Sequence, residues 1–166
     1  MLKKAKRPEV SVVMSAKNDE SWVRQSVSSI LLQTFEDFEF LIVDDASSDE
    51  TLRILYEFQA SDQRIKVFTN TETKGLTKNL NELIRKSCGR YIARMDSDDF
   101  SKPERLKEQW RFMKDNENVG LCFSRADIVN ADGTFLCKKW FPRSVHTATF
   151  LLPYINYFGH PTAFVK

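Results

Sequence analysis

The segment VSVVMSAKNDE, Val10–Glu20, passes from a run of β-branched and apolar residues directly into polar and charged ones. A short apolar run of this kind is typical of a buried strand, and we predict a strand over Val10–Met14. A helical pattern follows it, with apolar residues at Val23, Val27, Ile30 and Leu31. The segment therefore predicts a strand that ends in a polar edge and continues into a helix.

The same order of strand, polar edge and helix repeats along the chain. Further strands are predicted at Phe40–Val43, Ile65–Phe68, Tyr91–Met95 and Val119–Phe123. Further helices are predicted by apolar stripes at Leu52, Leu55 and Tyr56, then at Leu76, Leu80, Leu83 and Ile84, then at Leu106, Trp110 and Met113.

Residues that begin or end helices and turns support these boundaries. SSDE at Ser47–Glu50 has the spacing of a capping box and predicts a helix start. Gly75 breaks the chain before the next helix, and Gly89 suits the residue after the end of that helix. Pro103 fits the first turn of the last helix. NADG at Asn130–Gly133 predicts a turn between two short strands, Ile128-Val129 and Phe135-Leu136.

Alternating strands and helices predict an α/β fold, in which a mostly parallel sheet is flanked by helices on both faces. A chain of 166 residues fits one domain of ordinary size, so we expect a single domain over residues 1–166. The apolar content of 42% and charged content of 29% favour a soluble globular protein over a disordered one. The net charge of +2 predicts no bulk attraction to nucleic acid.

The cysteines and the start of the chain favour a cytoplasmic address. The 3 cysteines are odd in number and lack the close pairing of zinc sites, so we expect reduced thiols. MLKKAKRPEV lacks the apolar stretch of a signal peptide, and the longest mostly apolar run, Phe150–Phe158, is too short to span a bilayer. Residues 1–8 are expected to form a basic, solvated tail. Peripheral contact of Lys3–Arg7 with acidic lipids at the inner face of the membrane is the alternative.

Polar segments follow three of the predicted strands: SAKNDE, DDASSD and DSDD. Because ligands bind beyond the carboxyl ends of the strands in an open α/β sheet, we expect these segments to meet at one rim. The glycine-rich fingerprints G-x-G-x-x-G and G-x-x-x-x-G-K-[ST] are absent. The diphosphate of a bound nucleotide would therefore need another partner, such as a divalent cation held by carboxylates.

Asp96 and Asp98 are the candidate metal ligands. In extended chain, side chains two residues apart point the same way, so both carboxylates can address one cation. Mg²⁺ or Mn²⁺ prefers such oxygen ligands. Asp99 is expected to point elsewhere. A solvated acidic turn is the alternative for the D-x-D motif by itself, and its place at a strand end favours the metal site.

Asp44 and Asp45 end the second predicted strand. Either could cap the next helix, although Ser47 already offers a capping oxygen. A carboxylate at this position could instead accept the N3–H of a uracil base. We favour that binding role for Asp45, and for Asp44 both roles stay open.

Four segments together resemble the family-2 glycosyltransferases of bacterial polysaccharide synthesis: VSVVMSAKNDE, LIVDDASSDET, GLTKNLNELI and GRYIARMDSDD. The likeness begins at about Pro8 and continues to the last residue. It implies a GT-A fold, which has a Rossmann-like sheet, and a nucleotide-diphosphate sugar donor, with a UDP-sugar foremost. It also implies an inverting transfer to a saccharide or lipid-linked acceptor, assisted by Mg or Mn.

The resemblance implies a set of nucleotide-sugar-binding residues: Ser15, Asn18, Glu20, Asp44, Asp45, Gly75, Lys78, Asn81, Asp96 and Ser97. The first three fall in the family's first nucleotide-contacting loop. Asp45 matches the aspartate that contacts the base, and Lys78 is a candidate charge partner for the diphosphate. Asp96 and Asp98 match the family's metal-binding pair.

The chain departs from the family pattern in two segments. Ser15-Ala16-Lys17-Asn18 stands where Pro-Thr-Tyr-Asn is usual, which removes the aromatic contact to the base. Asn79-Leu80-Asn81 stands where Ala-Arg-Asn is common. GHPTAFVK, Gly159–Lys166, resembles the strand before the family's acidic helix, so the acceptor part and its catalytic base are expected beyond Lys166.

Structural roles are expected for the remaining candidates near the C-terminus. Asp127 is expected to be a loop residue and His160 a structural one, with acceptor contact as the alternative for His160. Core or subunit contacts, as in a homo-oligomer, are expected for the aromatic residues Trp140, Phe141, Phe150, Tyr154, Tyr157 and Phe158. An acceptor groove, or an interface with further sequence, is the alternative.

Two other functions compete with glycosyl transfer. A sugar nucleotidyltransferase also uses an α/β sheet and metal-binding carboxylates, but it normally has a glycine-rich loop after the first strand, and SAKNDE has none. A truncated or degenerate domain that binds nucleotide without transfer is the second competitor, because no convincing catalytic base is present.

Overall fold

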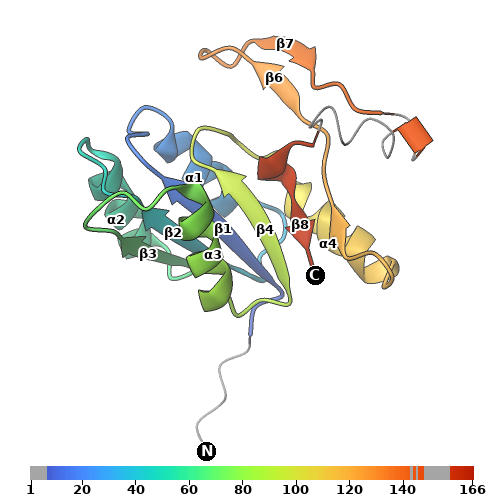
Figure 1. Ribbon diagram of the computed structural model, residues 1–166, viewed down its shortest axis with the longest axis horizontal. Coiled ribbons are helices and arrows are strands. Elements are labelled where there is room, and N and C mark those ends of the chain that lie inside the picture. The colour runs from blue at the N-terminus through green and yellow to red at the C-terminus, as the bar shows by residue number, and fades with distance from the viewer. Residues whose placement is uncertain (1–6, 143, 145, 148–157) are drawn as a thin grey trace, which may run out of the picture.

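Strands and helices alternate from Val10 to Asp115 in the computed structural model, which describes residues 7–142, 144, 146–147 and 158–166 (Figure 1). The first four strands are β1 (Val10–Ala16), β2 (Phe38–Asp44), β3 (Ile65–Thr69) and β4 (Tyr91–Asp96). The helices that follow them are α1 (Val23–Leu31), α2 (Thr51–Ser61), α3 (Leu76–Lys86) and α4 (Arg105–Asp115). Beyond α4 lie β5 (Leu121–Cys122), β6 (Asp127–Val129), β7 (Phe135–Lys138), the 3₁₀ helix η1 (His160–Thr162) and β8 (Phe164–Val165).

One sheet contains six strands in the order β3-β2-β1-β4-β8-β5. β1 pairs in parallel with β2 and β4, and β2 pairs in parallel with β3, whereas β8 runs antiparallel to β4 and β5. The predicted, mostly parallel α/β sheet is confirmed. The strand predicted at Val119–Phe123 is shorter than expected and lies at the sheet edge, because β8 inserts between it and β4.

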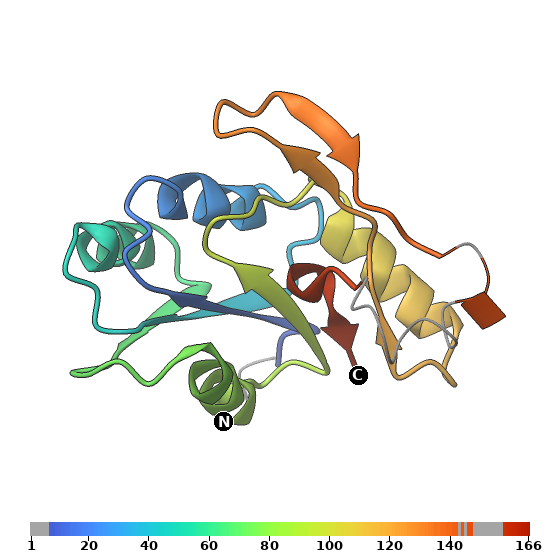
Figure 2. The same ribbon diagram turned by 45° about the horizontal axis from the view of Figure 1, so that its top comes forward.

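Helices cover both faces of the sheet, with α1, α2 and α4 on one face and α3 on the other (Figure 2). Successive side chains of a strand point to opposite faces, so β1 serves two cores. Met14 packs in the larger core with Val27 of α1 and Leu106 of α4. Val13 packs in the smaller core with Leu83 of α3. Every residue of β2 is buried, as expected for a strand covered on both faces.

Two of the predicted apolar stripes are partly wrong. Tyr56 of α2 is 45% exposed, and Ile54 is buried in the core instead. In α3, Leu76 and Ile84 are each 46% exposed, whereas Leu83 is buried. Because α3 contacts the sheet mainly through β1 and β2, only a narrow stripe of this helix is covered.

The capping box predicted at Ser47–Glu50 is wrong. α2 begins at Thr51, and the residue before it, Glu50, makes no side-chain cap. The Ser47 hydroxyl accepts the N–H of Asn18 at 3.0 Å instead. The polar side chain of Ser47 therefore positions a neighbouring loop rather than a helix end.

The backbone of β1 packs so closely against residue 89 that only glycine fits there. The role predicted for Gly89, as the residue after a helix end, is wrong. α3 ends at Lys86 and is followed by an extended Ser87, before the chain reaches Gly89. A Cβ atom on Gly89 would lie 2.5 Å from the backbone nitrogen of Ser11 and 2.7 Å from the carbonyl carbon of Val10. Only a hydrogen atom fits between these two segments.

β6 and β7 form a separate two-stranded antiparallel sheet, which confirms the predicted hairpin. The hairpin stands off the main sheet (Figure 1). Lys102, in the segment after β4, pairs with Asp127 of β6 at 2.7 Å and ties the hairpin to that segment. Among the described residues, no helix has the length and apolar character needed to cross a membrane.

Candidate functional site

The carboxyl ends of β1, β2 and β4 meet at one edge of the sheet. Ser15 of β1 is the register partner of Asp96 on β4, and Ala16 is the partner of Asp44 on β2. From β1 the sheet continues through β2 to β3 on one side and to β4 on the other. Open α/β sheets bind ligands at such a reversal of strand order, the topological switch point, beyond the carboxyl ends of the strands. The three polar segments therefore share one rim, as the sequence predicts.

Asn18 and Glu20 join the loop after β1 to the loop after β2. Asn18 Oδ1 accepts the Ser48 N–H at 2.8 Å. Glu20 Oε2 accepts the Glu50 N–H at 3.0 Å. Asn18 has a φ of 54°, a left-handed conformation that Asn adopts more readily than most residues. Both side chains are thus engaged in positioning the two rim loops.

Asp45 is 3% exposed and holds the loop that leads into α3. Its Oδ1 accepts the Asn70 side-chain amide and the Lys74 N–H, both at 2.8 Å. Its Oδ2 accepts the N–H of Gly75 at 2.9 Å. Burial by itself would raise the pKa of Asp45, but hydrogen bonds from this loop and from Asn79 outweigh it and lower the pKa to about 2. Asp45 therefore uses most of its hydrogen-bonding capacity to hold this loop.

Asp44 lies one residue earlier and serves the loop before α2. Its Oδ2 accepts the Ser47 N–H at 3.1 Å. Its Oδ1 is buried and has no hydrogen-bond partner among the described residues. Buried carboxylate oxygens without a partner are uncommon in proteins. Asp44 therefore has an unused acceptor beneath the rim.

The side-chain amide of Asn79, which is fully buried on α3, connects two rim segments. Its Nδ2 donates to Ser15 Oγ at 3.1 Å, and its Oδ1 accepts Asn70 Nδ2 at 2.8 Å. Neither Asn70 nor Asn79 is among the residues that the sequence singles out for the site. Asn70 directly follows β3, so the strand-end rule that selected the other rim residues also applies to it.

Ser97 is 6% exposed and links the D-x-D segment to the loop after β1. Its Oγ donates to Asp19 Oδ2 at 2.5 Å and lies 3.3 Å from the carbonyl oxygen of Ser15. The same Asp19 oxygen accepts the Lys17 N–H at 3.0 Å. Asp19 is a further rim residue that the sequence does not single out, although it lies within SAKNDE.

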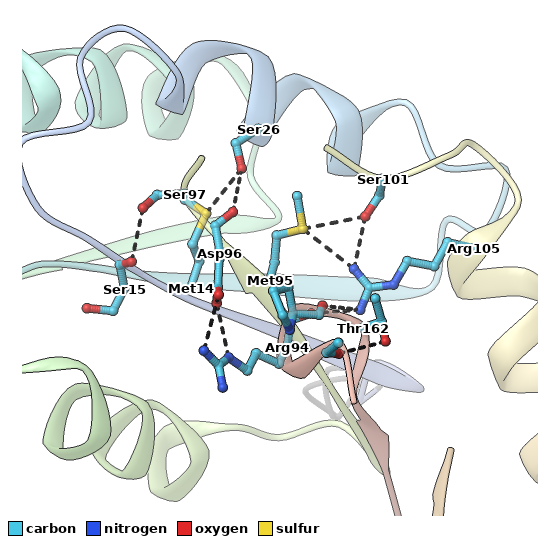
Figure 3. Close-up of polar contacts among 12 residues, drawn as sticks. Met14, Ser15, Ser26, Arg94, Met95, Asp96, Ser97, Ser101, Arg105 and Thr162 are labelled. Carbon is cyan, nitrogen blue, oxygen red and sulfur yellow. Dashed lines mark hydrogen bonds and ion pairs between the residues drawn. The ribbon is translucent and has the colours of Figure 1, made fainter. Parts of the chain in front are cut away.

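Asp96 forms an ion pair with Arg94 of the same strand (Figure 3). Arg94 Nε lies 3.0 Å from Oδ1 of Asp96, and Arg94 Nη2 lies 3.2 Å from Oδ2, so the guanidinium fork contacts both oxygens. Residues two apart in a strand share a face, and these two share the α3 face with Ile92. Asp98 is exposed, and its carboxylate makes no hydrogen bond or ion pair with another described residue.

The rim carboxylates suit a divalent cation in donor type. Desolvation, followed by the negative charges of Asp98 and Asp96, raises the pKa of Asp99, so a cation here would relieve repulsion. Within the described part of the chain, no group of three or more His, Cys, Asp or Glu side chains is arranged to hold a metal. β4 ends at Asp96 and the chain turns at Ser97 and Asp98, so the extended geometry on which the predicted pairing of Asp96 with Asp98 depends does not continue.

Gly75, Lys78 and Asn81 lie at the start of α3, next to the loop that Asp45 holds. Gly75 has a φ of 87° and precedes the first helical residue. Lys78 and Asn81 are exposed, and neither side chain hydrogen-bonds to another residue that the structure describes. Lys17 Nζ donates to Thr73 Oγ1 at 2.7 Å and so joins the loops after β1 and β3.

The sequence model of glycosyl transferase family 2 matches residues 11–164. The chain belongs to this family. It is 33% identical over 158 residues to the O-antigen biosynthesis glycosyltransferase WbnJ of Escherichia coli, which is 95% of this chain and 61% of that protein. It is 38% identical over 121 residues to the UDP-Glc:alpha-D-GlcNAc-diphosphoundecaprenol beta-1,3-glucosyltransferase WfgD of Escherichia coli, 73% of this chain and 47% of that protein. The chain thus spans less than two thirds of the length of either relative.

Solved structures confirm the GT-A fold of this family 2 chain. Staphylococcus aureus TarS 1–349 in complex with UDP-GlcNAc has a TM-score of 0.76 at 22% identity, over 95% of this chain and 45% of that one. The mannosyltransferase PcManGT from Pyrobaculum calidifontis, in complex with GDP-Man and Mn²⁺, has a TM-score of 0.65 at 21% identity, over 76% of this chain and 37% of that one. At these identities the likeness is one of fold.

Arg105 of α4 attaches η1, which leads into β8, to β4 (Figure 3). Its Nη2 donates to the carbonyl oxygens of Arg94 at 2.7 Å and Pro161 at 2.9 Å, and its Nη1 donates to Ser101 Oγ at 2.9 Å. Burial lowers the pKa of Arg105 to about 10. The sequence gives no sign of this role, because Arg105 stands beside the apolar stripe of α4 as an ordinary helix residue would.

The remaining candidates lie near the hairpin and η1. Asp127 begins strand β6, so its predicted place in a loop is wrong, and it pairs there with Lys102. His160 is exposed at the start of η1. The rings of Phe123 and Phe158 stack with centroids 4.3 Å apart, whereas Trp140 is 57% exposed. Outside the described residues lie Phe150, Tyr154, Tyr157 and the basic residues before Arg7.

Proposed function

We propose that this chain binds the donor in a glycosyltransferase that moves a sugar from a UDP-sugar to a saccharide or lipid-linked acceptor. The observation that carries the proposal is the pairing of Ser15 with Asp96 at the switch point of a family 2 domain, beside the loop held by Asp45. The relative WfgD is named for a UDP-Glc donor, and the TarS structure contains UDP-GlcNAc. Both support a UDP-sugar as the donor of this chain.

Each rim residue has a role in donor binding under this proposal. Asp45 is the proposed contact of the base N–H, and the exposed Lys78 pairs with the diphosphate. Asp96 and Asp98 hold a divalent cation, in line with the Mn²⁺ present in the PcManGT complex. When bound, such a cation supplies positive charge that stabilises the departing diphosphate.

The transfer is proposed to invert the anomeric centre. An acceptor hydroxyl attacks the anomeric carbon from the face opposite the diphosphate, the bond from that carbon to the diphosphate breaks, and the hydroxyl proton passes to a general base. The base must lie within hydrogen-bond reach of the acceptor hydroxyl. We assign this role to none of the described residues.

Calorimetric titration with nucleotides tests donor binding. UDP is expected to bind more tightly than GDP or ADP, and Mn²⁺ or Mg²⁺ is expected to strengthen its binding. Asp98→Ala should weaken metal-dependent UDP binding about tenfold or more, a loss of at least about 1.4 kcal/mol. Asp115→Ala, which removes an exposed carboxylate at the end of α4, is the matched control and should leave binding unchanged. Equal metal-dependent binding by Asp98→Ala and the unsubstituted chain would contradict the site assignment.

Product analysis separates transfer from the two competing functions. A glycosyltransferase releases free UDP from its sugar donor, whereas a nucleotidyltransferase forms or consumes pyrophosphate. Binding of UDP with Mn²⁺, without turnover of any UDP-sugar when acceptors are supplied, would favour a non-catalytic binding domain.

A further inference from the structure

We infer that Asn79 is a positioning residue of the donor site, which directs the hydroxyl hydrogen of Ser15 toward an oxygen of the bound nucleotide. This inference rests on the proposed function, because it adds a residue to the same site. It gives a role to a fully buried amide that lies beneath the rim.

Four polar side chains from different segments form a continuous chain of hydrogen bonds below the rim. Asn70 Nδ2 donates to Asp45 Oδ1 and to Asn79 Oδ1, both at 2.8 Å. Asn79 Nδ2 donates in turn to Ser15 Oγ at 3.1 Å. Because the Asn79 side chain is 0% exposed, bulk water does not compete for either end of its amide. The chain of hydrogen bonds therefore connects the Asp45 carboxylate to the Ser15 hydroxyl.

The charge of Asp45 sets the direction of every hydrogen bond in this chain. With its pKa at about 2, the Asp45 carboxylate is ionised at neutral pH and can only accept, so Asn70 presents its Nδ2 to it. The other hydrogen of that Nδ2 needs an acceptor, which places Oδ1 of Asn79 toward Asn70 and Nδ2 of Asn79 toward Ser15. Ser15 Oγ therefore accepts from Asn79, and its own hydrogen points elsewhere.

The hydroxyl hydrogen of Ser15 has no acceptor among the residues that the structure describes. The partner of Ser15 on the adjacent strand, Asp96, pairs with Arg94 and makes no hydrogen bond to the Ser15 hydroxyl (Figure 3). Ser15 lies near the carboxyl end of β1, at the switch point where the donor is proposed to bind. Since a half-buried hydroxyl usually has an acceptor, an oxygen of the nucleotide is the acceptor that the proposed function supplies.

Ser15 and Asn79 are also two positions at which the chain departs from the family pattern. Pro is usual at the first position and Ala is common at the second, and neither side chain can form this hydrogen bond. The contact is therefore a property of this chain rather than of the pattern. Because Ala is common at the second position, Asn79→Ala is expected to fold.

A double-substitution cycle on UDP binding, measured by calorimetric titration, is the primary test. Asn79→Ala should weaken UDP binding about fivefold, as expected when one oriented hydrogen bond is lost. In a chain that already carries Ser15→Ala, the same substitution should cause a further loss of less than about twofold, because the hydroxyl that Asn79 directs is gone. Equal losses in the two backgrounds, or unchanged binding by Asn79→Ala, would overturn the inference.

Gln109→Ala is the matched control for removal of a buried helix amide. Gln109 Oε1 accepts Arg105 Nε at 3.1 Å, and its Nε2 donates to the carbonyl oxygen of Thr162 at 2.8 Å. Because Gln109 lies on α4, on the other face of the sheet, its substitution should lower stability in urea without changing UDP affinity. A loss of affinity as large as that of Asn79→Ala would attribute both losses to destabilisation and reject the role of Asn79.

Rescue by a conservative variant provides a second readout. Ser15→Thr restores a hydroxyl and should recover most of the UDP affinity that Ser15→Ala loses, whereas a role of Ser15 in strand packing alone predicts no recovery.

Titrations of uridine, UMP and UDP into Ser15→Ala and the unsubstituted chain locate the acceptor oxygen. A loss with all three ligands places that oxygen on the nucleoside, and a loss confined to the phosphorylated ligands places it on a phosphate. No loss with any of them would overturn the inference. Failure of the unsubstituted chain to bind UDP would reject the donor site and the inference with it, whereas normal UDP binding with equal losses in the cycle would reject the role of Asn79 alone.

Discussion

Asp44 and Asp45 are neighbours in sequence, yet their carboxylates are used in different ways. Asp45 accepts hydrogen bonds from Asn70, Lys74 and Gly75, whereas Asp44 accepts one from Ser47 and leaves an oxygen unpaired among the described residues. Charged hydrogen bonds of the Asp45 type contribute more to stability than neutral ones. The carboxylate that holds the loop before α3 is thus the one proposed to contact the donor base.

Asp45→Asn should lower the free energy of unfolding by about 2 kcal/mol at pH 7, because it replaces a charged acceptor that faces several N–H donors. The folded-state pKa of Asp45 lies at about 2, below the ordinary 3.8. Its contribution is therefore complete above about pH 4 and is lost as the pH falls toward 2. Urea denaturation of both proteins at pH 7, 4 and 2.5 measures the difference.

The difference between Asp45→Asn and the unsubstituted chain should shrink at the lowest pH. Asp115→Asn, at an exposed position on α4, is the control and should change stability little at any pH. A constant difference from pH 7 to 2.5 would show that the charge of Asp45 does not stabilise the fold.

Ala46 has a φ of 57°, in the left-handed region that disfavours residues with a Cβ atom. Ala46→Gly should relieve this strain and stabilise the domain by about 0.5–1 kcal/mol. Ala60→Gly makes the same chemical change within α2, where it should destabilise by a similar amount. Thermal unfolding of the pair checks both signs, and destabilisation by Ala46→Gly would contradict the strain argument.

Among the secondary-structure elements, those before residue 115 were predictable because each carries its own apolar pattern. The strand predicted at Val119–Phe123 is observed only as the two-residue β5, and the places of β5 and β8 in the sheet depend on which edge remains free after β4 has formed. Tyr56 and Leu76 were misplaced for a related reason. Their spacing fits an apolar stripe, but the width of that stripe is set by how much of the helix the sheet covers.

The connection between α3 and β4 depends on the absence of a side chain at Gly89. Gly89→Ala should destabilise the domain by at least about 2–3 kcal/mol, because the new Cβ would meet backbone atoms of β1 that are fixed by strand pairing. Gly120→Ala is the matched control, since a Cβ at Gly120 meets nothing within 4 Å. Equal midpoints of urea denaturation for the two variants would show that this contact can relax.

The candidate site was predictable only in outline. Strand-end position was enough to bring Ser15, Asp45 and Asp96 to one rim, because parallel strands end together. The partners of these residues were not predictable, since Arg94 and Asn79 contact the rim through side-chain orientation and tertiary packing that spacing does not encode. The donor contacts of Lys78 and Asn81 remain predictions from the family resemblance.

At the scale of the whole molecule, Arg105 joins α4, β4 and η1 through buried hydrogen bonds. Arg105→Met should lower the free energy of unfolding by about 3 kcal/mol or more, because buried carbonyl groups lose their donor. Hydrogen exchange should accelerate most at the amides that pair β8 with β4. Arg111→Met, at an exposed position of the same helix, should have little effect, and equal exchange at β8 in the two variants would contradict this role.

The antiparallel insertion of β8 has a consequence for the order of assembly. β4 pairs with β1, which precedes it in the chain, on one side, whereas on its other side it pairs with β8, which follows only after α4, β5 and the hairpin of β6 and β7. During synthesis the outer edge of β4 therefore emerges from the ribosome well before its partner. Until β8 arrives, the unpaired N–H and C=O groups of that edge can template pairing with another nascent chain. Misassembly of this domain should begin at β4, with the growing polypeptide most vulnerable between the synthesis of α4 and that of β8.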